Sequence, residues 1–394
     1  MPESLTLQPM IFTNGRVILP DGIRDDVDVV IREGKIAELR PRGATLDGLD
    51  LCRNYLGPGF VDLHVHGAVG RDAMDGSAHS FREICGYHAT GGTTSLLLTT
   101  ATSEIEQITS VLAAVRELRP QIPQVAGAHV EGPFISPEKP GAQNPRFICE
   151  PTPELVERLF AYREVIKRIT IAPEIPGALE CIERFVSAGV SVSGGHSNAW
   201  DEEARAGFER GMRSVTHTFN CMSSARRRGI HRVAGLLEFA LSEPEISCEL
   251  IADGRHVSAT LMKMLYRAKG RNRISLVTDA TAGAGLDEGT QFELAGKICV
   301  VAGGVCMLAD RSALAGSASS MIDLVRTIVR DRGIPLEEAI AMASRNPARD
   351  IGLHGKGEIA VGNDADLVII SPALAIERTF LAGECIYSRE SELE

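Results

Sequence analysis

Histidine and carboxylate side chains stand at the ends of several short apolar runs. Each run stops at a residue that can bind a metal ion or move a proton, and polar residues or glycine follow it. These residues are His64, His66, Glu131, His196, His217, Asp253, His256 and Asp279. Imidazole and carboxylate groups bind divalent transition metals, and a further carboxylate can serve as general base for hydrolysis. The pattern therefore predicts a hydrolytic metal site.

Each of these residues also has an ordinary structural explanation when it is considered alone. His64 and His66 share one face of a strand by its two-residue period, but such a pair arises readily by chance in a chain with ten histidines. Glu131 could cap a helix or pair with an arginine, and Asp279 could be an N-cap residue. The metal interpretation depends on their coincidence at strand ends.

The apolar runs alternate with helical stretches through the middle of the chain. We expect strands over 60–65, 93–98, 125–130, 169–171, 190–193, 214–216, 247–251 and 274–278, and helices over 80–89, 104–118, 152–167, 178–187, 201–210 and 258–268. Continuous apolar strands need cover on both faces, so this alternation predicts an α/β fold, a (β/α)8 TIM-type barrel. A doubly wound sheet is the alternative. In a barrel the C-terminal strand ends meet at one mouth, where active sites form.

The two ends of the chain differ from this middle part, because both consist of short β-like runs with turn signals. Asn14-Gly15 and Glu33-Gly34 each separate two such runs and predict hairpins. We therefore expect residues 1–56 and 355–394 to form one small β-sandwich domain, and residues 57–354 to form the barrel.

Composition excludes several classes of protein. The 394 residues carry a formal net charge of −11, so no broad basic face is available for nucleic acid. No apolar run approaches the roughly 18 residues of a membrane span, and Met1–Met10 lack the features of a secretory signal. The nine cysteines form no C-x-x-C pair, which indicates reduced thiols and a cytoplasmic protein.

Several motifs together resemble a known family. They are LGPGFVDLHVHG at 56–67, HVEGPF at 129–134, GHS at 195–197, THTFN at 216–220, LIADGRH at 250–256, VTDAT at 277–281 and LAGS at 314–317. In this order and over essentially the whole chain, they are similar to the N-acetylglucosamine-6-phosphate deacetylases of the amidohydrolase superfamily. The closing segment 357–368 resembles the final β segment of amidohydrolases in general.

The resemblance implies a fold, a reaction and a set of site residues. Members are metal-dependent barrels, usually homodimeric, that remove the acetyl group from an N-acetylhexosamine 6-phosphate. Zinc, iron or manganese would suit the ligands better than magnesium or calcium, with one or two ions per subunit. By position, Glu131, His196 and His217 correspond to ligands of the main metal, His64 and His66 to ligands of a second metal in some members, and Asp279 to the catalytic acid/base. The positions that contact sugar or phosphate correspond to Ala142, Asn220, Cys221, Asp253, His256, Ala313, Leu314 and Ala315.

The sequence departs from the family pattern in two loops. Gln143 stands where the family usually has a substrate-contacting histidine, and it cannot carry charge. The family's phosphate-binding arginine, which often reaches the neighbouring subunit's substrate, lies in a segment that here reads SARRRGIHRVAG at 224–235. Counting from His217 favours Arg228, whereas counting back from Gly235 leaves Arg232. A solvated basic loop is the alternative interpretation.

Three functions remain to be separated. The first is a metal-dependent deacetylase of N-acetylglucosamine 6-phosphate in amino-sugar catabolism. The second is a deacylase of another substrate, such as N-acetylgalactosamine 6-phosphate or a non-phosphorylated N-acyl compound. The third is a non-catalytic scaffold with the same fold, which would need neither Glu131, His196 and His217 nor Asp279.

Overall fold

A computed structural model describes residues 9–43 and 48–389 of the chain. Residues 1–8, 44–47 and 390–394 lie outside the described part. They include most of the N-terminal segment in which we expected no secretory signal, and both outer ends of the predicted small domain.

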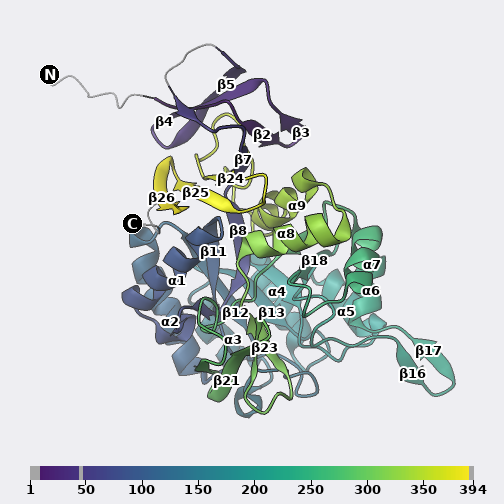
Figure 1. Ribbon diagram of the computed structural model, residues 1–394. Helices are drawn as coiled ribbons and strands as arrows, with labels where there is room; N and C mark the ends of the chain where they lie inside the picture. Colours follow the sequence, from purple (N-terminus) through teal and green to yellow (C-terminus); the bar gives the residue numbers. More distant parts are fainter. Residues whose placement is uncertain (1–8, 44–47, 390–394) are drawn as a thin grey trace.

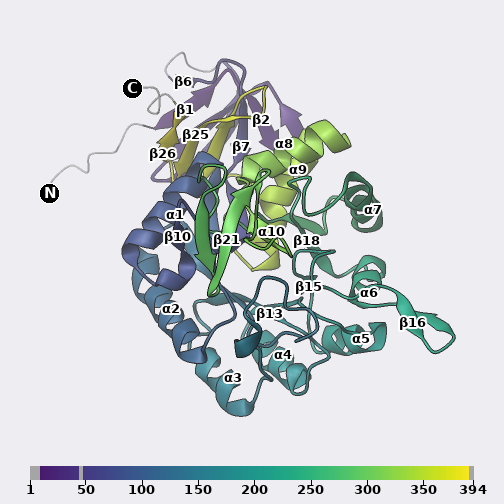
Figure 2. The ribbon, with the colours of Figure 1, turned by 60° about the horizontal axis from the view of Figure 1, so that its bottom comes forward.

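Eight parallel strands form the predicted barrel (Figures 1 and 2). Each pairs with its neighbour in the order β8-β11-β12-β13-β14-β15-β18-β19, and a bridge between Val65 and Ala280 connects the segment after the last strand to the first. The strands are β8 (Phe60–Val65), β11 (Thr93–Thr100), β12 (Val125–Glu131), β13 (Ile166–Ile171), β14 (Ser191–Gly194), β15 (Ser214–Val215), β18 (Ser247–Leu250) and β19 (Ile274–Leu276). The fold class predicted from the sequence is confirmed.

Helices cover the outside of this sheet. They are α1 (Ala78–Thr90), α2 (Ile105–Leu118), α3 (Pro153–Phe160), α4 (Ala178–Ser187), α5 (Asp201–Glu209), α6 (Leu236–Ser242), α7 (Ala259–Lys269), α8 (Met321–Arg332), α9 (Leu336–Ala343) and α10 (Arg345–Asp350). The helix predicted over 152–167 is too long, because α3 ends at Phe160 and β13 begins at Ile166. Lys167 and Arg168 gave this strand a helix-like polarity. The sequence reasoning also missed α6 and α8–α10.

Strands from both chain ends form two further sheets that share an apolar core. One sheet contains β1 (Met10–Thr13), β4 (Val27–Arg32), β5 (Lys35–Pro41) and β6 (Leu49–Asp50); the other contains β2 (Arg16–Leu19), β3 (Gly22–Arg24), β7 (Tyr55–Pro58), β24 (Leu367–Ile370), β25 (Ile376–Leu381) and β26 (Glu384–Ser388). Phe12 and Phe380 meet edge to face in this core, with ring centroids 5.2 Å apart. The purple and yellow strands therefore lie together in Figure 1. We propose residues 1–56 and 355–394 as the limits of this small domain.

One of the two predicted hairpins is absent. At Asn14-Gly15 the chain crosses between the sheets, since β1 pairs with β4 and β6 whereas β2 pairs with β3 and β7. A Cβ on Gly15 would lie 2.3 Å from Leu51 Cδ1, so close packing explains this glycine. The second hairpin is present: β4 and β5 pair antiparallel, and Glu33 and Gly34 both have positive φ, as a type I′ turn requires.

Three additions extend from the mouth of the barrel. A short ribbon of β9 (Gly67–Ala68) and β10 (Arg71–Asp72) follows β8. An antiparallel sheet of β20 (Gln291–Leu294), β21 (Lys297–Ala302), β22 (Val305–Leu308) and β23 (Leu314–Ser317) follows β19. A hairpin of β16 (Arg226–Arg228) and β17 (His231–Val233) projects away from the barrel in Figures 1 and 2. We call residues 226–233 the arm.

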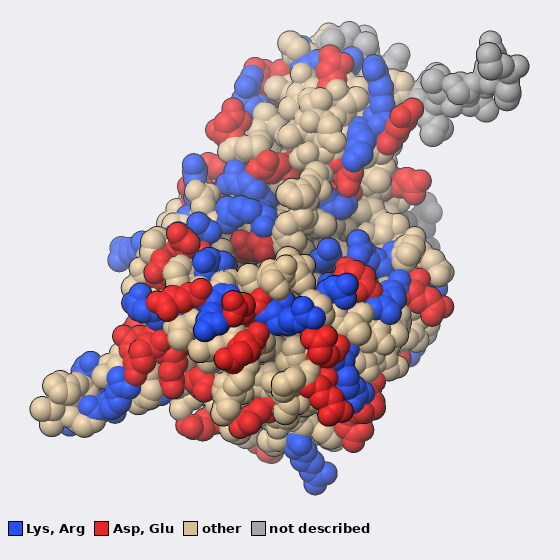
Figure 3. Space-filling model, turned by 180° about the vertical axis from the view of Figure 1, so that it is seen from behind, with Lys and Arg blue, Asp and Glu red and all other residues tan. Residues whose placement is uncertain are grey.

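The surface and the helices agree with the composition. On the face shown in Figure 3, basic and acidic side chains are interspersed, and no extended patch of one sign stands out. Within residues 9–43 and 48–389, no helix combines the length and apolarity needed to cross a bilayer.

Candidate metal centre

The predicted metal-binding residues converge at the barrel mouth in two groups. The first contains Glu131, His196 and His217, and the second contains His64, His66 and Asp279. Within each group the ligand atoms lie within 4.8 Å of one another. They come from the ends of β8, β12, β14, β15 and β19, so the parallel barrel explains how residues distant in sequence meet here.

The first group has the spacing of a metal-ligand set. Glu131 Oε1 lies 3.2 Å from His196 Nε2 and 3.1 Å from His217 Nε2, and the two histidine nitrogens are 3.0 Å apart. Ligands bound at about 2.0–2.1 Å in tetrahedral geometry stand about 3.3–3.4 Å apart. His196 Nδ1 lies 2.8 Å from the carbonyl oxygen of Lys139, so Nδ1 is suited to carry the proton and Nε2 to bind. These donors fit a divalent cation.

The second group shares Glu131 with the first. His64 Nε2 lies 3.2 Å from His66 Nε2, and Asp279 Oδ1 lies 3.4 Å and 3.5 Å from these two nitrogens. Glu131 Oε1 is 3.4 Å from His64 Nε2, and its other oxygen, Oε2, is 3.1 Å from His66 Nε2. The Glu131 carboxylate therefore lies within reach of both groups.

Electrostatics at the site favour a bound positive charge. Burial opposes ionisation of Glu131, yet the neighbouring imidazoles of His64 and His196 hold the pKa of its carboxyl well below the usual range. Burial likewise opposes protonation of His64, but Glu131 and Asp279 raise its pKa well above the usual value. The carboxylates thus attract protons to the histidines, and a metal cation satisfies the same carboxylates while releasing those protons.

Several site residues adopt backbone conformations that are unusual outside glycine. His196, His217, Cys221 and Asp279 have φ of 47°, 29°, 47° and 48°, all in or near the left-handed region. Such conformations cost of order 1–3 kcal/mol each and cluster at functional sites, where surrounding structure holds them. The strand ends are therefore bent to aim these side chains into the mouth.

A cavity of about 220 Å³ opens onto both groups. Of the predicted substrate contacts, the cavity is lined by Ala142, Gln143, Asn220, Cys221, His256, Ala313 and Leu314. Ala315 lies behind it, fully buried against Leu294 and Cys299. Asp253 does not line the cavity either; its Oδ2 lies 2.7 Å from His256 Nδ1 and orients that ring. His256 Nε2 has no partner among the described residues.

Gln143 has a second role that its position in the sequence did not indicate. Its side-chain amide donates to Glu131 Oε2 at 2.6 Å, and its oxygen accepts from the backbone N–H of Thr102 at 2.7 Å. The residue is 6% exposed. Gln143 therefore orients a carboxylate of the candidate metal centre as well as facing the cavity.

The arm holds Arg228 and Arg232 outside the cavity of their own chain. Arg228 pairs with Glu202 and lies over the ring of Trp200, 4.6 Å from its centroid. Arg232 stands opposite Arg227 in the hairpin register, and both are exposed. None of residues 226–233 lines this cavity, and the arm projects away from the barrel in Figure 2.

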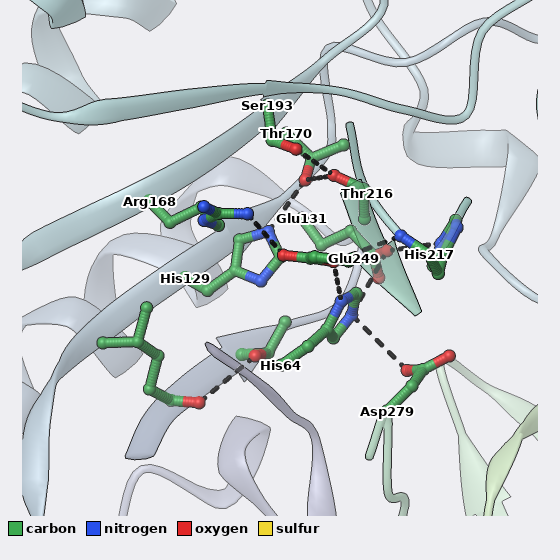
Figure 4. A network of polar contacts seen from close by, with 12 residues as sticks. His64, His129, Glu131, Arg168, Thr170, Ser193, Thr216, His217, Glu249 and Asp279 are labelled. Carbon is green, nitrogen blue, oxygen red and sulfur yellow. Dashed lines mark hydrogen bonds and ion pairs between the residues drawn. The ribbon is translucent and has the colours of Figure 1, made fainter. Parts of the chain in front are cut away.

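Sequence reasoning missed a buried polar network behind His64, which Figure 4 shows. Glu249 on β18 lies 3.3 Å from His64 Nδ1 and accepts a hydrogen bond from Arg168 on β13. His129 Nε2 and Thr170 Oγ1 are 2.8 Å apart in the same interior. The available signal was a charged residue inside an otherwise apolar strand, as in the run around Glu249.

Comparisons with known proteins place the chain in a family. Residues 55–386 match the amidohydrolase family. An N-acetylglucosamine-6-phosphate deacetylase from Lysinibacillus sphaericus is 33% identical over 380 residues, covering 95% of this chain and 97% of the relative. An N-acetylgalactosamine-6-phosphate deacetylase from Escherichia coli O157:H7 is 31% identical, covering 94% of this chain and 97% of the relative.

A solved structure agrees over the whole fold. The crystal structure of N-acetylglucosamine-6-phosphate deacetylase from Pasteurella multocida superposes with a TM-score of 0.91 at 32% identity, covering 97% of this chain and all of that one. The match therefore includes the small β domain as well as the barrel. The chain belongs to the amidohydrolase family and, within it, to the N-acetylglucosamine-6-phosphate deacetylases.

Proposed function

We propose that the protein hydrolyses the acetamido group of an N-acetylhexosamine 6-phosphate, with N-acetylglucosamine 6-phosphate as the substrate and acetate and the amino-sugar phosphate as products. The main support is that the two ligand groups, one of which includes Asp279, meet around Glu131 at one cavity. The chain also matches deacetylases over almost its whole length. A scaffold would have no use for this costly arrangement of buried charge.

The first ligand group, Glu131, His196 and His217, holds the main divalent cation in this proposal. His64 and His66, with Asp279, hold a second one. Zinc, iron and manganese suit these nitrogen and oxygen donors. A cation bound here supplies Lewis acidity, which lowers the pKa of a water molecule and polarises an amide oxygen.

Asp279 acts as the acid/base residue. Its carboxylate faces the cavity and lies beside both histidines of the second group. It takes the proton of the attacking water and returns it to the departing amine, which leaves poorly unless it is protonated. His256, fixed through Nδ1 by Asp253, offers its unpartnered Nε2 to a polar substituent of the sugar.

The phosphate is bound with help from a second subunit. No lysine or arginine is among the residues lining the cavity in the described part of the chain. The arm carries Arg227 and Arg232, which form no ion pair with another described residue, and its tip residue Ile230 is 90% exposed. A homodimer in which each arm reaches its partner's cavity would bury that tip and supply the missing guanidinium groups.

The second candidate function is deacetylation of the epimeric substrate, N-acetylgalactosamine 6-phosphate. Glucosamine and galactosamine substrates differ in the configuration of one hydroxyl group, and a relative at 31% identity is named as a deacetylase of N-acetylgalactosamine 6-phosphate.

All nine thiols of the chain are free, which supports the expectation of a reducing compartment and of a cytoplasmic enzyme.

A panel of substrates tests the proposal. Purified protein loaded with zinc, manganese or iron is assayed for acetate release from N-acetylglucosamine and N-acetylgalactosamine, each with and without 6-phosphate. We expect the highest kcat/KM for N-acetylglucosamine 6-phosphate. Absence of deacetylation of all four compounds by metal-loaded protein would refute the proposal, and a preference for the galactose epimer would move the assignment to the second candidate.

A further inference from the structure

Glu249 is a fully buried carboxylate whose contacts all lead to the candidate metal centre or to Arg168. Its Oε2 lies 3.3 Å from His64 Nδ1 and accepts the backbone N–H of His217 at 3.1 Å. Its Oε1 accepts from Arg168 Nη1 at 2.5 Å. Glu249 therefore contacts one residue of each ligand group (Figure 4), and it is not among the residues that line the cavity.

The main partner of Arg168 is this carboxylate, whose charge it balances. Its side chain is completely buried on β13. Nη2 lies 3.3 Å from Ser191 Oγ, and Nε has no partner within residues 9–43 and 48–389. Replacing a buried ion pair by well-packed apolar residues is often neutral or stabilising, and barrel interiors are usually filled by branched aliphatic residues. Stability alone therefore does not explain the Glu249–Arg168 pair.

The contact with His64 offers an explanation. An ionised carboxylate at Nδ1 requires this nitrogen to carry the proton, and Nε2 then presents its lone pair toward His66, Glu131 and Asp279. A histidine that binds a metal almost always donates its other N–H to such a partner, which fixes the tautomer and increases the basicity of the ring. His66 Nδ1 and His217 Nδ1 have no partner among the described residues, so this device is specific to His64 in the second group.

We propose that Glu249 and Arg168 are positioning residues that prepare the second ligand group to bind a divalent cation. Arg168 neutralises Glu249 and fixes its orientation, and Glu249 fixes the tautomer and direction of His64. The inference rests on the proposed metal-dependent function and deepens it, because it assigns to the second cation site two supporting residues that do not line the cavity. In the first group the pair touches no imidazole: the His196 ring is oriented by the Lys139 carbonyl, and His217 reaches Glu249 only through its backbone N–H.

Zinc binding to the purified full-length protein tests this inference. Metal-free wild type is titrated with Zn²⁺ against a chromogenic chelator, and bound zinc per chain is measured by elemental analysis. We expect two zinc ions per chain in wild type. In Glu249→Gln the NH2 group of the amide would face an N–H donor, because His64, His217 and Arg168 all donate to Glu249. The affinity of the second zinc should therefore fall about 10- to 100-fold. The first zinc should be retained.

Two further variants separate positioning from folding. The double variant Glu249→Leu/Arg168→Met removes the whole pair without leaving a buried charge, so its metal-free melting temperature should match or exceed that of wild type. It should nevertheless lose the second zinc. Asp366→Asn is the matched control, because Asp366 is a buried carboxylate paired with Lys356 in a contact remote from the cavity. This control should bind two zinc ions.

The inference is overturned if wild type binds only one zinc at saturation, or if both Glu249 variants bind the second zinc with wild-type affinity. Failure of the proposed reaction would be a different result. It would appear as wild type that holds two zinc ions but releases no acetate from any amino sugar.

Discussion

The arm provides the most discriminating prediction about substrate recognition. Replacing Arg227 and Arg232 together by alanine removes the exposed guanidinium pair of the hairpin and leaves the cavity of the same chain untouched. A hydrogen bond to a charged group contributes about 1.5–3 kcal/mol, so losing one arginine–phosphate contact should lower kcat/KM for the 6-phosphate substrate roughly ten- to a hundredfold. The non-phosphorylated sugar should change little.

The measurement is the ratio of kcat/KM for N-acetylglucosamine with and without 6-phosphate. Arg228→Ala is the matched control, because Arg228 is already engaged by Glu202 and Trp200, and the ratio should fall less than in the double variant. An unchanged ratio in the Arg227/Arg232 double variant would refute the role of the arm in phosphate binding.

A mixed dimer tests whether the arm acts on the partner subunit. One subunit carries Asp279→Asn with an intact arm, and the other carries an intact Asp279 with the Arg227/Arg232 double replacement. Each homodimer should be weak, whereas the mixed dimer, purified with two affinity tags, should regain up to half of the wild-type activity because one cavity is complete. A mixed dimer no more active than its parents would show that the arm serves its own chain or no substrate.

Four further outcomes follow from the site and the core. Asp279→Asn should lower turnover by about two orders of magnitude or more while elemental analysis shows that the zinc of the first group remains; near-normal turnover would contradict the assignment. Chelator-stripped protein should lose acetate release and regain it with a transition metal, and full activity in demonstrably metal-free protein would contradict metal dependence. Gln143→Leu removes the donor to Glu131 Oε2 and should weaken metal retention about 10- to 100-fold in chelator competition. Burial lowers the pKa of His88 to about 4, so the native state excludes a proton that the unfolded chain binds below about pH 6.5, and stability is lost as pH falls toward 4. Urea unfolding of His88→Gln should therefore show a loss over this range that is smaller by about 3 kcal/mol; equal losses would contradict the interpretation.

Much of the fold could be predicted because its strongest constraints are local. Continuous apolar strands between amphipathic helices need two covered faces, and the carboxyl ends of such strands meet at one mouth. These two rules, applied to the sequence, are sufficient to predict that His64, Glu131, His196, His217 and Asp279 lie together, as they do. Asn14-Gly15 shows the limit of local signals. This dipeptide is typical of a hairpin turn, but in this protein it connects a strand of one sheet to a strand of the other.

The parts that escaped prediction depend on contacts between distant strands. The predicted strand began only at Ile169, after Arg168, since a buried guanidinium in a barrel strand is explicable only through Glu249, 81 residues later. Gln143 was interpreted as a substrate contact that had lost its charge, whereas its amide is bound to Glu131. In both cases the residue type is unusual for its location until its partner is known.

The charges around His64 connect these findings. Glu131, Asp279 and Glu249 contact its ring, and Arg168 balances Glu249. With neutral imidazoles, these three carboxylates and one guanidinium leave two uncompensated negative charges in a buried space, which is costly without a counter-charge. One divalent cation would cancel them, and a second would leave the centre positive. A positive centre attracts an anionic sugar phosphate into a cavity whose described lining contains no lysine or arginine. If two cations bind as proposed, emptying the second site should raise KM for the phosphorylated sugar.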